Sequence, residues 1–346
     1  MKALWLLSLA IAIPGGPSVA AEARSTTDIY WADVDGGAAT LIVTPAGESL
    51  LVDSGEDKRL HAARIHSLMK EAGLKQIDHF VISHWHADHY GGTHELTKLA
   101  PIRHYYANSP LPVSVPDDPA FPVLMSLYRK TNTGRTLELR PGSTIALRQR
   151  AGVPAISLRA VASDRRTIAA PPNAARNPLC NQPAPPPQLD DGENAKSLVL
   201  LLEYGTFRFL DVGDLSWHIE ERLACPADLV GPVDLYQISH HGLDRSNNPH
   251  FVHMLRPRVV VVNNSPVKGA EPRSMKTVLS APGLEAVWQL YENKRSEPKL
   301  NASPTRIANA ANGQAGNYLK ASIQPDGSFS VQAGGGGHRE VYRHKR

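Results

Sequence analysis

The sequence has 346 residues, of which 42% are hydrophobic and 20% charged, and its formal net charge is +4. This composition lies near the globular average and excludes both wholesale disorder and a membrane-spanning bundle. The basic residues are spread along the chain apart from a cluster in residues 338–346, so the charge does not indicate a nucleic-acid-binding surface, although a nucleic acid stays open as a partner.

The first residues have the pattern of an export signal. A positively charged start precedes an apolar run over residues 3–13, and small residues follow near Ala21 and Ala23. The run is too short to span a bilayer, and this order of features is typical of a cleaved signal peptide. We therefore predict a signal peptide over residues 1–23 and a periplasmic or secreted mature protein that has no transmembrane segment. An uncleaved anchor or a buried N-terminal helix is the alternative.

Strand patterns and one amphipathic helix follow. Three runs rich in β-forming residues, separated by glycine and proline turns, predict strands over residues 27–34, 39–44 and 49–52. Over residues 58–72 the apolar side chains recur at helical spacing and Gly73 follows as a stop, which predicts a helix.

The next strand leads into a histidine-rich segment. A strand is predicted over residues 77–82, and a second helical stretch follows near residues 93–99. The histidines between them therefore lie at the carboxyl end of a strand. Open α/β sheets usually hold their chemistry there, in loops supported by rigid strands.

Residues 108–194 differ in composition from the rest of the chain, because prolines recur throughout them and indicate turns and loops. We predict a long insertion that arches over or beside the site, with a surface spacer as the alternative. Of the two cysteines, Cys180 lies in this segment and Cys225 beyond it. Export would allow them to form one disulfide, which we predict, and two unpaired buried thiols are the alternative.

The rest of the chain repeats the strand-rich plan of its beginning. A helix is expected over residues 217–223 and a glycine-rich, basic tail over residues 333–346. We predict a single domain over residues 24–332, with no boundary between independent domains. The predicted strands of this part are 197–203, 207–212, 234–239, 258–263, 286–291, 318–324 and 328–332.

Three clusters of candidate metal ligands follow predicted strands. Imidazole and carboxylate groups suit zinc and similar divalent ions, and ligands at alternate positions can point to one centre while the next pair serves a neighbouring one. Asp214 could bridge two ions, and one histidine of the last cluster could complete the ligands of the second metal. The other histidine could donate a proton or support a ligand by a hydrogen bond. The clusters are His84, His86, Asp88 and His89 in the first, Asp214 in the second, and His240 and His241 in the third.

With these residues the chain resembles the metallo-β-lactamase superfamily, whose signature of two histidines, an aspartate and a histidine matches the first cluster. Within it the chain is most similar to the hydrolase domain of the competence protein ComEC, over roughly residues 28–265 apart from the insertion. The resemblance implies an α/β fold, the αββα sandwich, with the metals at one edge and Asp53 supporting the histidine segment. Asn194 stands where many members place a third histidine on the first metal. ComEC carries a membrane channel that this chain lacks, so a DNA-uptake pore is excluded.

The implied cofactors are two divalent metal ions, zinc first and manganese as the alternative, holding a hydroxide that attacks an acyl carbon or a phosphorus. Asp88, His240 and His241 are the catalytic candidates. Possible substrate-binding residues at predicted strand ends are Asn194, Lys196, Asn263 and Ser265, and local hydrogen bonding is their alternative role.

The substrate class stays open at this stage. A phosphodiester ranks first because of the ComEC resemblance and because two metals suit in-line displacement at phosphorus. A lactone, an ester or a β-lactam is the second possibility, and a non-catalytic metal-binding protein is the third.

Overall fold

The computed structural model describes residues 24–132, 134–186, 189–309 and 316–344. The predicted signal peptide at residues 1–23 lies outside the described residues. Within the described ranges, no helix combines the length and the apolar character needed to cross a membrane.

The first of two large sheets joins the beginning of the chain to its end. It is antiparallel from its outer C-terminal strand to β3 and parallel from β3 onward. The strands, in spatial order, are β18 (Arg339–Tyr342), β17 (Phe329–Ala333), β16 (Leu319–Ile323), β1 (Thr27–Trp31), β2 (Thr40–Val43), β3 (Ser49–Val52), β4 (Ile77–Ile82), β5 (Ile102–Ala107) and β6 (Thr136–Glu138).

The second sheet contains the strands of the second half and is parallel from β11 to β15. Strand β9 (Arg166–Thr167) pairs with β8 beside the main path. The other strands, in spatial order, are β15 (Ile307–Asn309), β14 (Ala286–Tyr291), β13 (Val259–Val262), β12 (Leu235–Gln237), β11 (Phe207–Asp211), β10 (Val199–Tyr204), β8 (Ile156–Ser163) and β7 (Thr144–Ile145).

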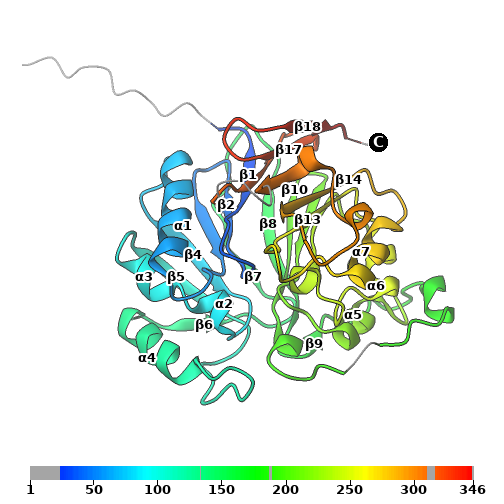
Figure 1. The fold of residues 1–346 in the computed structure, drawn as a ribbon, viewed down its shortest axis with the longest axis horizontal. Helices are drawn as coiled ribbons and strands as arrows, with labels where there is room; N and C mark the ends of the chain where they lie inside the picture. The colour runs from blue at the N-terminus through cyan, green and yellow to red at the C-terminus, as the bar shows by residue number, and fades with distance from the viewer. Residues whose placement is uncertain (1–23, 133, 187–188, 310–315, 345–346) are drawn as a thin grey trace, which may run out of the picture.

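Helices cover the outer face of each sheet, so the molecule has four layers (Figure 1). The helices beside the first sheet are α1 (Arg59–Glu71), α2 (Ala87–Tyr90), α3 (Thr93–Thr97) and α4 (Phe121–Thr131), and those beside the second are α5 (Trp217–Ala224), α6 (Pro249–Leu255) and α7 (Pro272–Leu279). Short 3₁₀ helices are η1 (Pro178–Asn181), η2 (Asn194–Lys196), η3 (Ser239–Gly242), η4 (Pro298–Leu300) and η5 (Pro304–Arg306). The predicted α/β sandwich is confirmed.

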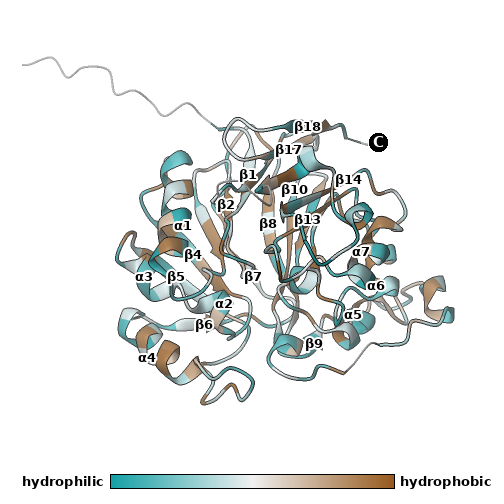
Figure 2. Cartoon of the chain, in the orientation of Figure 1, coloured by the Kyte–Doolittle hydropathy of each residue, from teal (hydrophilic) through white to brown (hydrophobic). Residues whose placement is uncertain are grey.

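Apolar burial explains the layers. Alternate side chains of the strands meet between the sheets, where Trp31, Val81, Phe209 and Trp288 are fully or almost fully buried, and the opposite faces of the strands pack under the helices. Figure 2 shows hydrophobic residues along the strands and a mixture of hydrophilic and hydrophobic residues on the helices. This packing leaves the strand ends free to carry loops.

Two segments differ from the sequence prediction. Residues 108–194 are not a separate insertion, because they supply α4, β6, β7, β8 and β9, and β8 pairs along its length with β10. The predicted tail over residues 333–346 contains β18, which pairs with β17 and is held by the bidentate contact of Arg306 with Glu340 at 2.8 and 2.9 Å. In both segments, pairing with a neighbouring strand of the sheet overrides the local glycine and proline signals.

The predicted disulfide is present. Cys180 and Cys225 are bonded, with their Cα atoms 5.8 Å apart. The bond joins η1 to the residue that follows α5. It therefore fastens the proline-rich strap, residues 168–186 and 189–193, to the helical layer of the second sheet.

Candidate metal centre

A buried aspartate organises the histidine loop, residues 83–89. Strands β3 and β4 are parallel neighbours, so the residues that follow them lie together at one sheet edge. The carboxylate of Asp53 accepts hydrogen bonds from the backbone N–H of Ser83 at 2.8 Å, from its hydroxyl at 2.6 Å and from Nδ1 of His89 at 2.7 Å. The contact with Nδ1 leaves Nε2 of His89 directed into the centre, as the predicted supporting role of Asp53 requires.

The hydrogen bonds of the loop also set the tautomers of His84 and His86. The single hydroxyl proton of Ser83 goes to Asp53, so its oxygen accepts from Nδ1 of His84 at 3.1 Å. Nε2 of His86 lies 3.2 Å from a carboxylate oxygen of Asp117 and donates to it. The remaining nitrogens, Nε2 of His84 and Nδ1 of His86, therefore face each other as two acceptors 3.0 Å apart. Two facing lone pairs repel unless a cation lies between them.

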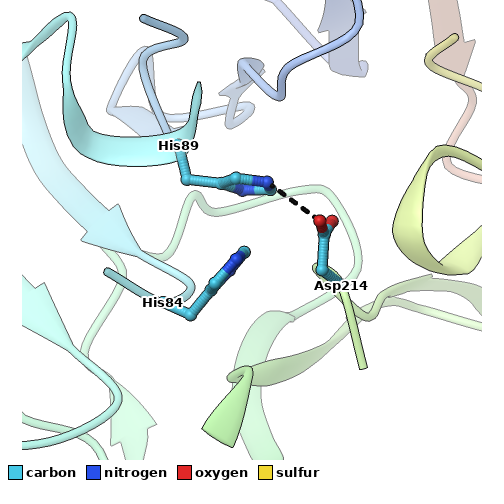
Figure 3. A group of neighbouring side chains, drawn as sticks. All are labelled: His84, His89 and Asp214. Carbon is cyan, nitrogen blue, oxygen red and sulfur yellow. Dashed lines mark ion pairs between the residues drawn. The ribbon is translucent and has the colours of Figure 1, made fainter. Parts of the chain in front are cut away.

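Asp214 closes the first group of ligands from the second sheet. Figure 3 shows His84, His89 and Asp214 directed toward one another, and their ligand atoms lie within 4.8 Å. Burial opposes charge on both His89 and Asp214, but their mutual attraction, with help from neighbouring groups, outweighs it. The pKa of His89 is thereby raised well above its ordinary value, and that of Asp214 is lowered well below it.

Asp88, His89 and His241 form a second group, whose ligand atoms also lie within 4.8 Å of one another. Neither ring nitrogen of His241 has a hydrogen-bond partner among the described residues, although its Nε2 lies 3.4 Å from Asp214. The chain approaches Asp88 closely at Gly37, where a Cβ would lie only 2.4 Å from the carbonyl oxygen of Asp88. A larger residue at position 37 would displace this ligand.

His240 occupies a different place from His241. Its Nδ1 is 3.3 Å from the hydroxyl of Ser246, which donates its own proton to the carbonyl of Leu215 at 2.7 Å, so Nδ1 of His240 is the donor. Its Nε2 lies 3.3 Å from Asp214. Burial lowers the pKa of His240 to about 4, so the free imidazole is neutral and its Nε2 accepts rather than donates. The predicted role of a proton donor requires its charged form.

The donor set fits two divalent cations. It combines imidazole nitrogens with buried carboxylates, the ligands that zinc and related ions take in proteins. The facing acceptors of His84 and His86, together with the unpartnered nitrogens of His241, are groups that such ions would satisfy.

Sequence comparison agrees with this geometry. The family model described as the metallo-beta-lactamase superfamily matches residues 32–155, which include Asp53 and the histidine loop. Residues 32–155 are therefore similar to the metallo-beta-lactamase superfamily.

Relatives of the chain are distant. It is 34% identical over 65 residues to a lactamase-like protein, notP, of Aspergillus sp. (strain MF297-2), which is 19% of this chain, and it spans only 20% of that relative's length. Among solved structures, it is similar to a metal-dependent hydrolase of Parabacteroides distasonis, with 11% identity, a TM-score of 0.41 and coverage of 76% of this chain and 93% of the other. A diiron β-hydroxylase of Streptomyces venezuelae gives 16% identity, a TM-score of 0.38 and coverage of 72% and 49%.

Asn194 lies outside the residues that the family model matches. Its Nδ2 donates to Asp190 at 2.9 Å, and its buried Oδ1 has no hydrogen-bond partner among the described residues. The ammonium group of Lys196 pairs with Glu193 at 2.6 Å, so local structure uses this predicted substrate residue.

The other two predicted substrate residues follow β13. Asn263 has a buried Oδ1 without a partner in the described part of the chain. The hydroxyl of Ser265 accepts from the backbone N–H groups of Val267 and Lys268, and this turn brings the ammonium group of Lys268 to 2.5 Å from Asp88. Lys268 was not among the sequence candidates. A lone lysine in a glycine-containing loop after a strand gives no spacing signal.

Three more residues of the centre were missed. Asp117, Asp118 and Glu193 contact the histidine loop from within the predicted insertion. A cavity of about 360 Å³ lies beside them, lined by Asp117, Leu189, Asp190, Asp191, Gly192 and Arg245. Acidic residues in a loop are usually caps or solvated charges, so sequence alone gave no reason to choose them.

Proposed function

We propose that this chain is a dinuclear metal-dependent hydrolase. The observation that supports it most is the pair of acceptor nitrogens on His84 and His86, which face each other at 3.0 Å. Because nothing in the chain lies between these lone pairs to offset their repulsion, the arrangement suits a cation. Zinc is the first candidate and manganese the alternative, since imidazole and carboxylate ligands bind both.

The ligands divide into two groups around Asp214. His84 and His86 would hold the first ion, and Asp88, His89 and His241 would hold the second, while Asp214 lies 3.3 Å from His89 and 3.4 Å from His241. Two ions bound there would lower the pKa of a bound water and polarise the substrate. Asp53 and Ser83 fix the ring orientations of the histidines, so the chain positions its ligands in advance.

A phosphodiester is the substrate class that we propose. Lys268 supplies a half-buried ammonium group beside Asp88, and its pKa is raised because neighbouring carboxylates outweigh the effect of burial. A fixed positive charge next to two metal ions suits an anionic substrate. The ComEC-like sequence motifs favour the same class. His240 belongs to neither metal group, so we assign it to the substrate, with its Nε2 at the edge of the centre.

Export to the periplasm or to the outside of the cell is part of the proposal. Its support is the disulfide between Cys180 and Cys225, since such bonds form and persist in oxidising compartments. The pattern of a signal peptide in residues 1–23 points the same way.

The test is metal analysis together with turnover. We would measure bound metal in the purified protein by mass spectrometry, and assay bis-p-nitrophenyl phosphate, a lactone and a cephalosporin. We expect two metal equivalents and metal-dependent hydrolysis of the phosphodiester. The Asp88→Ala, His89→Ala double variant removes two ligands of the second ion and should lose the activity. The matched control is Asp326→Asn, in the exposed turn after β16, which should retain it.

Each other outcome changes the proposal in a defined way. Turnover of the lactone or the cephalosporin instead of the phosphodiester would move the protein to acyl chemistry. Two bound metals without turnover on any substrate would make it a non-catalytic metal-binding protein. Absence of bound metal under all loading conditions would contradict the proposal altogether.

A further inference from the structure

The histidine loop leaves its sheet at Ile82 and needs other partners for its backbone. Buried N–H groups are almost always paired in folded proteins. The N–H of Trp85 donates to Oε1 of Glu193 at 3.3 Å, and the N–H of Ala87 donates to Oδ2 of Asp118 at 2.8 Å. Glu193 is 2% exposed and Asp118 is 7% exposed, so water does not compete strongly for either contact. Carboxylates that are not metal-ligand candidates thus bind the N–H groups of two alternate residues of the loop, Trp85 and Ala87.

A third carboxylate holds a ligand side chain of the same loop. Oδ2 of Asp117 lies 3.2 Å from Nε2 of His86, so this nitrogen carries the proton and Nδ1 is left as the acceptor that faces His84. Without Asp117, either ring nitrogen of His86 could carry the proton. In one of the two tautomers, Nδ1 could not bind a metal.

The three carboxylates belong to one connected structure. Oδ2 of Asp117 also accepts from the N–H of Glu193 at 3.5 Å, and a Cβ on Gly192 would lie 2.6 Å from that oxygen. Asp118 turns the chain into α4 by accepting from the N–H of Ala120 at 2.9 Å. The loop before α4 and the end of the strap therefore meet on the histidine loop.

We propose that Asp117, Asp118 and Glu193 form an acidic clamp that positions the first metal site, with Asp117 fixing the metal-binding tautomer of His86. This inference rests on the metal centre of the proposed function, but not on its substrate. The segment that seemed an insertion thereby becomes part of the site's construction. Partners of this kind orient a metal ligand and increase its basicity, and their loss typically weakens binding about 10- to 100-fold.

The test is a calorimetric titration of metal-free protein with Zn²⁺. In Asp117→Ala we expect the affinity of one site to fall about 10- to 100-fold while the other is little changed. Asp117→Asn keeps an acceptor oxygen for Nε2 of His86 and should restore part of the loss. The matched control is Asp191→Asn, because Asp191 lies on the same strap but pairs with Arg165 at 2.9 Å rather than with the histidine loop. It should bind Zn²⁺ like the unsubstituted protein.

A second readout detects the tautomer directly. In ¹⁵N NMR spectra of the metal-free protein, His86 should carry its proton on Nε2, and Asp117→Ala should produce a mixture of tautomers. Unchanged affinities together with an unchanged tautomer in Asp117→Ala would overturn the inference. So would equal weakening of both sites in a variant whose thermal unfolding is unchanged. If the protein binds two Zn²⁺ ions but hydrolyses nothing, the proposed activity fails while the clamp is still tested by the titration.

Discussion

The two halves of the centre hold their ligands in different ways. In the first half, the histidine loop is held by negative charge, from Asp53 on one side and the acidic clamp on the other. In the second half, His240 and His241 lie on the double-histidine loop, residues 239–248. Neutral side chains of Ser246 and Asn247 hold this loop from inside, and the carboxylates of Glu220 and Glu271 accept from its backbone N–H groups.

In the second half, an unusual backbone conformation is added to these contacts. His240 and His241 have φ values of 53° and 56°, in the left-handed region that non-glycine residues seldom adopt. The side chain of Asn247 brackets Ser239, accepting from its N–H at 3.3 Å and donating to its carbonyl at 3.0 Å. Gly269 makes room for the loop, because a Cβ there would lie 2.2 Å from the carbonyl of His241. Such strained positions persist only where the surroundings fix them.

The difference shows that one site can position its ligands in two ways, by charge in the first half and by backbone strain and packing in the second. Charge sets the proton positions of the first half, so substitutions without a change of shape should act there on metal affinity. Strain and packing set the second half, so substitutions there should also act on stability. Both expectations can be tested.

The largest effects are expected when the two neighbouring histidines, His240 and His241, are substituted one at a time. His241→Ala should lose one of two metal equivalents, because His241 belongs to the group with Asp88 and His89. His240→Ala should keep both metals and lower turnover by about 100-fold or more, the usual contribution of a positioned acid–base group. Metal analysis and kinetics on the same preparations check this. Loss of metal in His240→Ala would reverse the assignment.

Glu220 gives a pH-dependent test of the second half. Its carboxylate accepts from the N–H groups of Asn247 and Asn248 at 3.0 and 2.7 Å, and burial raises its pKa from 4.5 to about 7. Between these two values the folded state holds more protons than the unfolded state, so the free energy of unfolding should fall as the pH rises from 4.5 to 7. The fall should be on the order of 3 kcal/mol.

Glu220→Gln removes this titration and serves as the comparison. We expect the stability advantage of the unsubstituted protein over the variant to shrink as the pH rises through this window, as measured by urea unfolding at several pH values. A constant difference across the window would show that Glu220 has an ordinary pKa. Asp326→Asn, far from the loop, should show no such trend.

Asn247→Ala should have the smallest effect of the three. It leaves the carbonyl of Ser239 without its side-chain partner, whereas the N–H of Ser239 keeps the hydroxyl of Tyr236 as an acceptor at 3.1 Å. The lost contact should lower the free energy of unfolding by about 2 kcal/mol. A thermal unfolding curve measures the loss. If stability is unchanged while His241 still binds metal, the loop does not depend on the contact between Asn247 and Ser239. The proposed difference between the two halves would then be wrong.

The sequence predicted the parts of the fold that local patterns determine. The strands of residues 27–52 and 77–82 and the helix near residues 58–72 have clear periodicity, and the structure has them within a few residues. The helix α4 was not predicted, although its buried residues Phe121, Leu124, Met125 and Tyr128 have helical spacing. The prolines around it are turn signals and indicated irregular structure instead. The strand β8 pairs with β10, which follows about 40 residues later, and no local pattern records this partner.

The candidate site divides in the same way. His84 to His89 form a dense motif in one stretch of sequence, and the structure brings them together with Asp214, His240 and His241. Asp117 and Glu193 reach the same loop from positions far apart in the chain, and Lys268 does so from a third. Their roles arise only from tertiary contact, so single residues of common type could not be recognised in advance.

The pairing of β1 with β16 has a consequence for the order of folding. Thr27 lies opposite Ile323, and both ends of the described chain lie at the top of Figure 1, with α2 in the lower half. The first strand therefore keeps an open edge until almost the whole polypeptide has been synthesised, and contacts of such sequence separation form slowly. An open edge strand invites pairing with other chains. Truncation before β16 should thus yield a protein that aggregates rather than a smaller, active fragment.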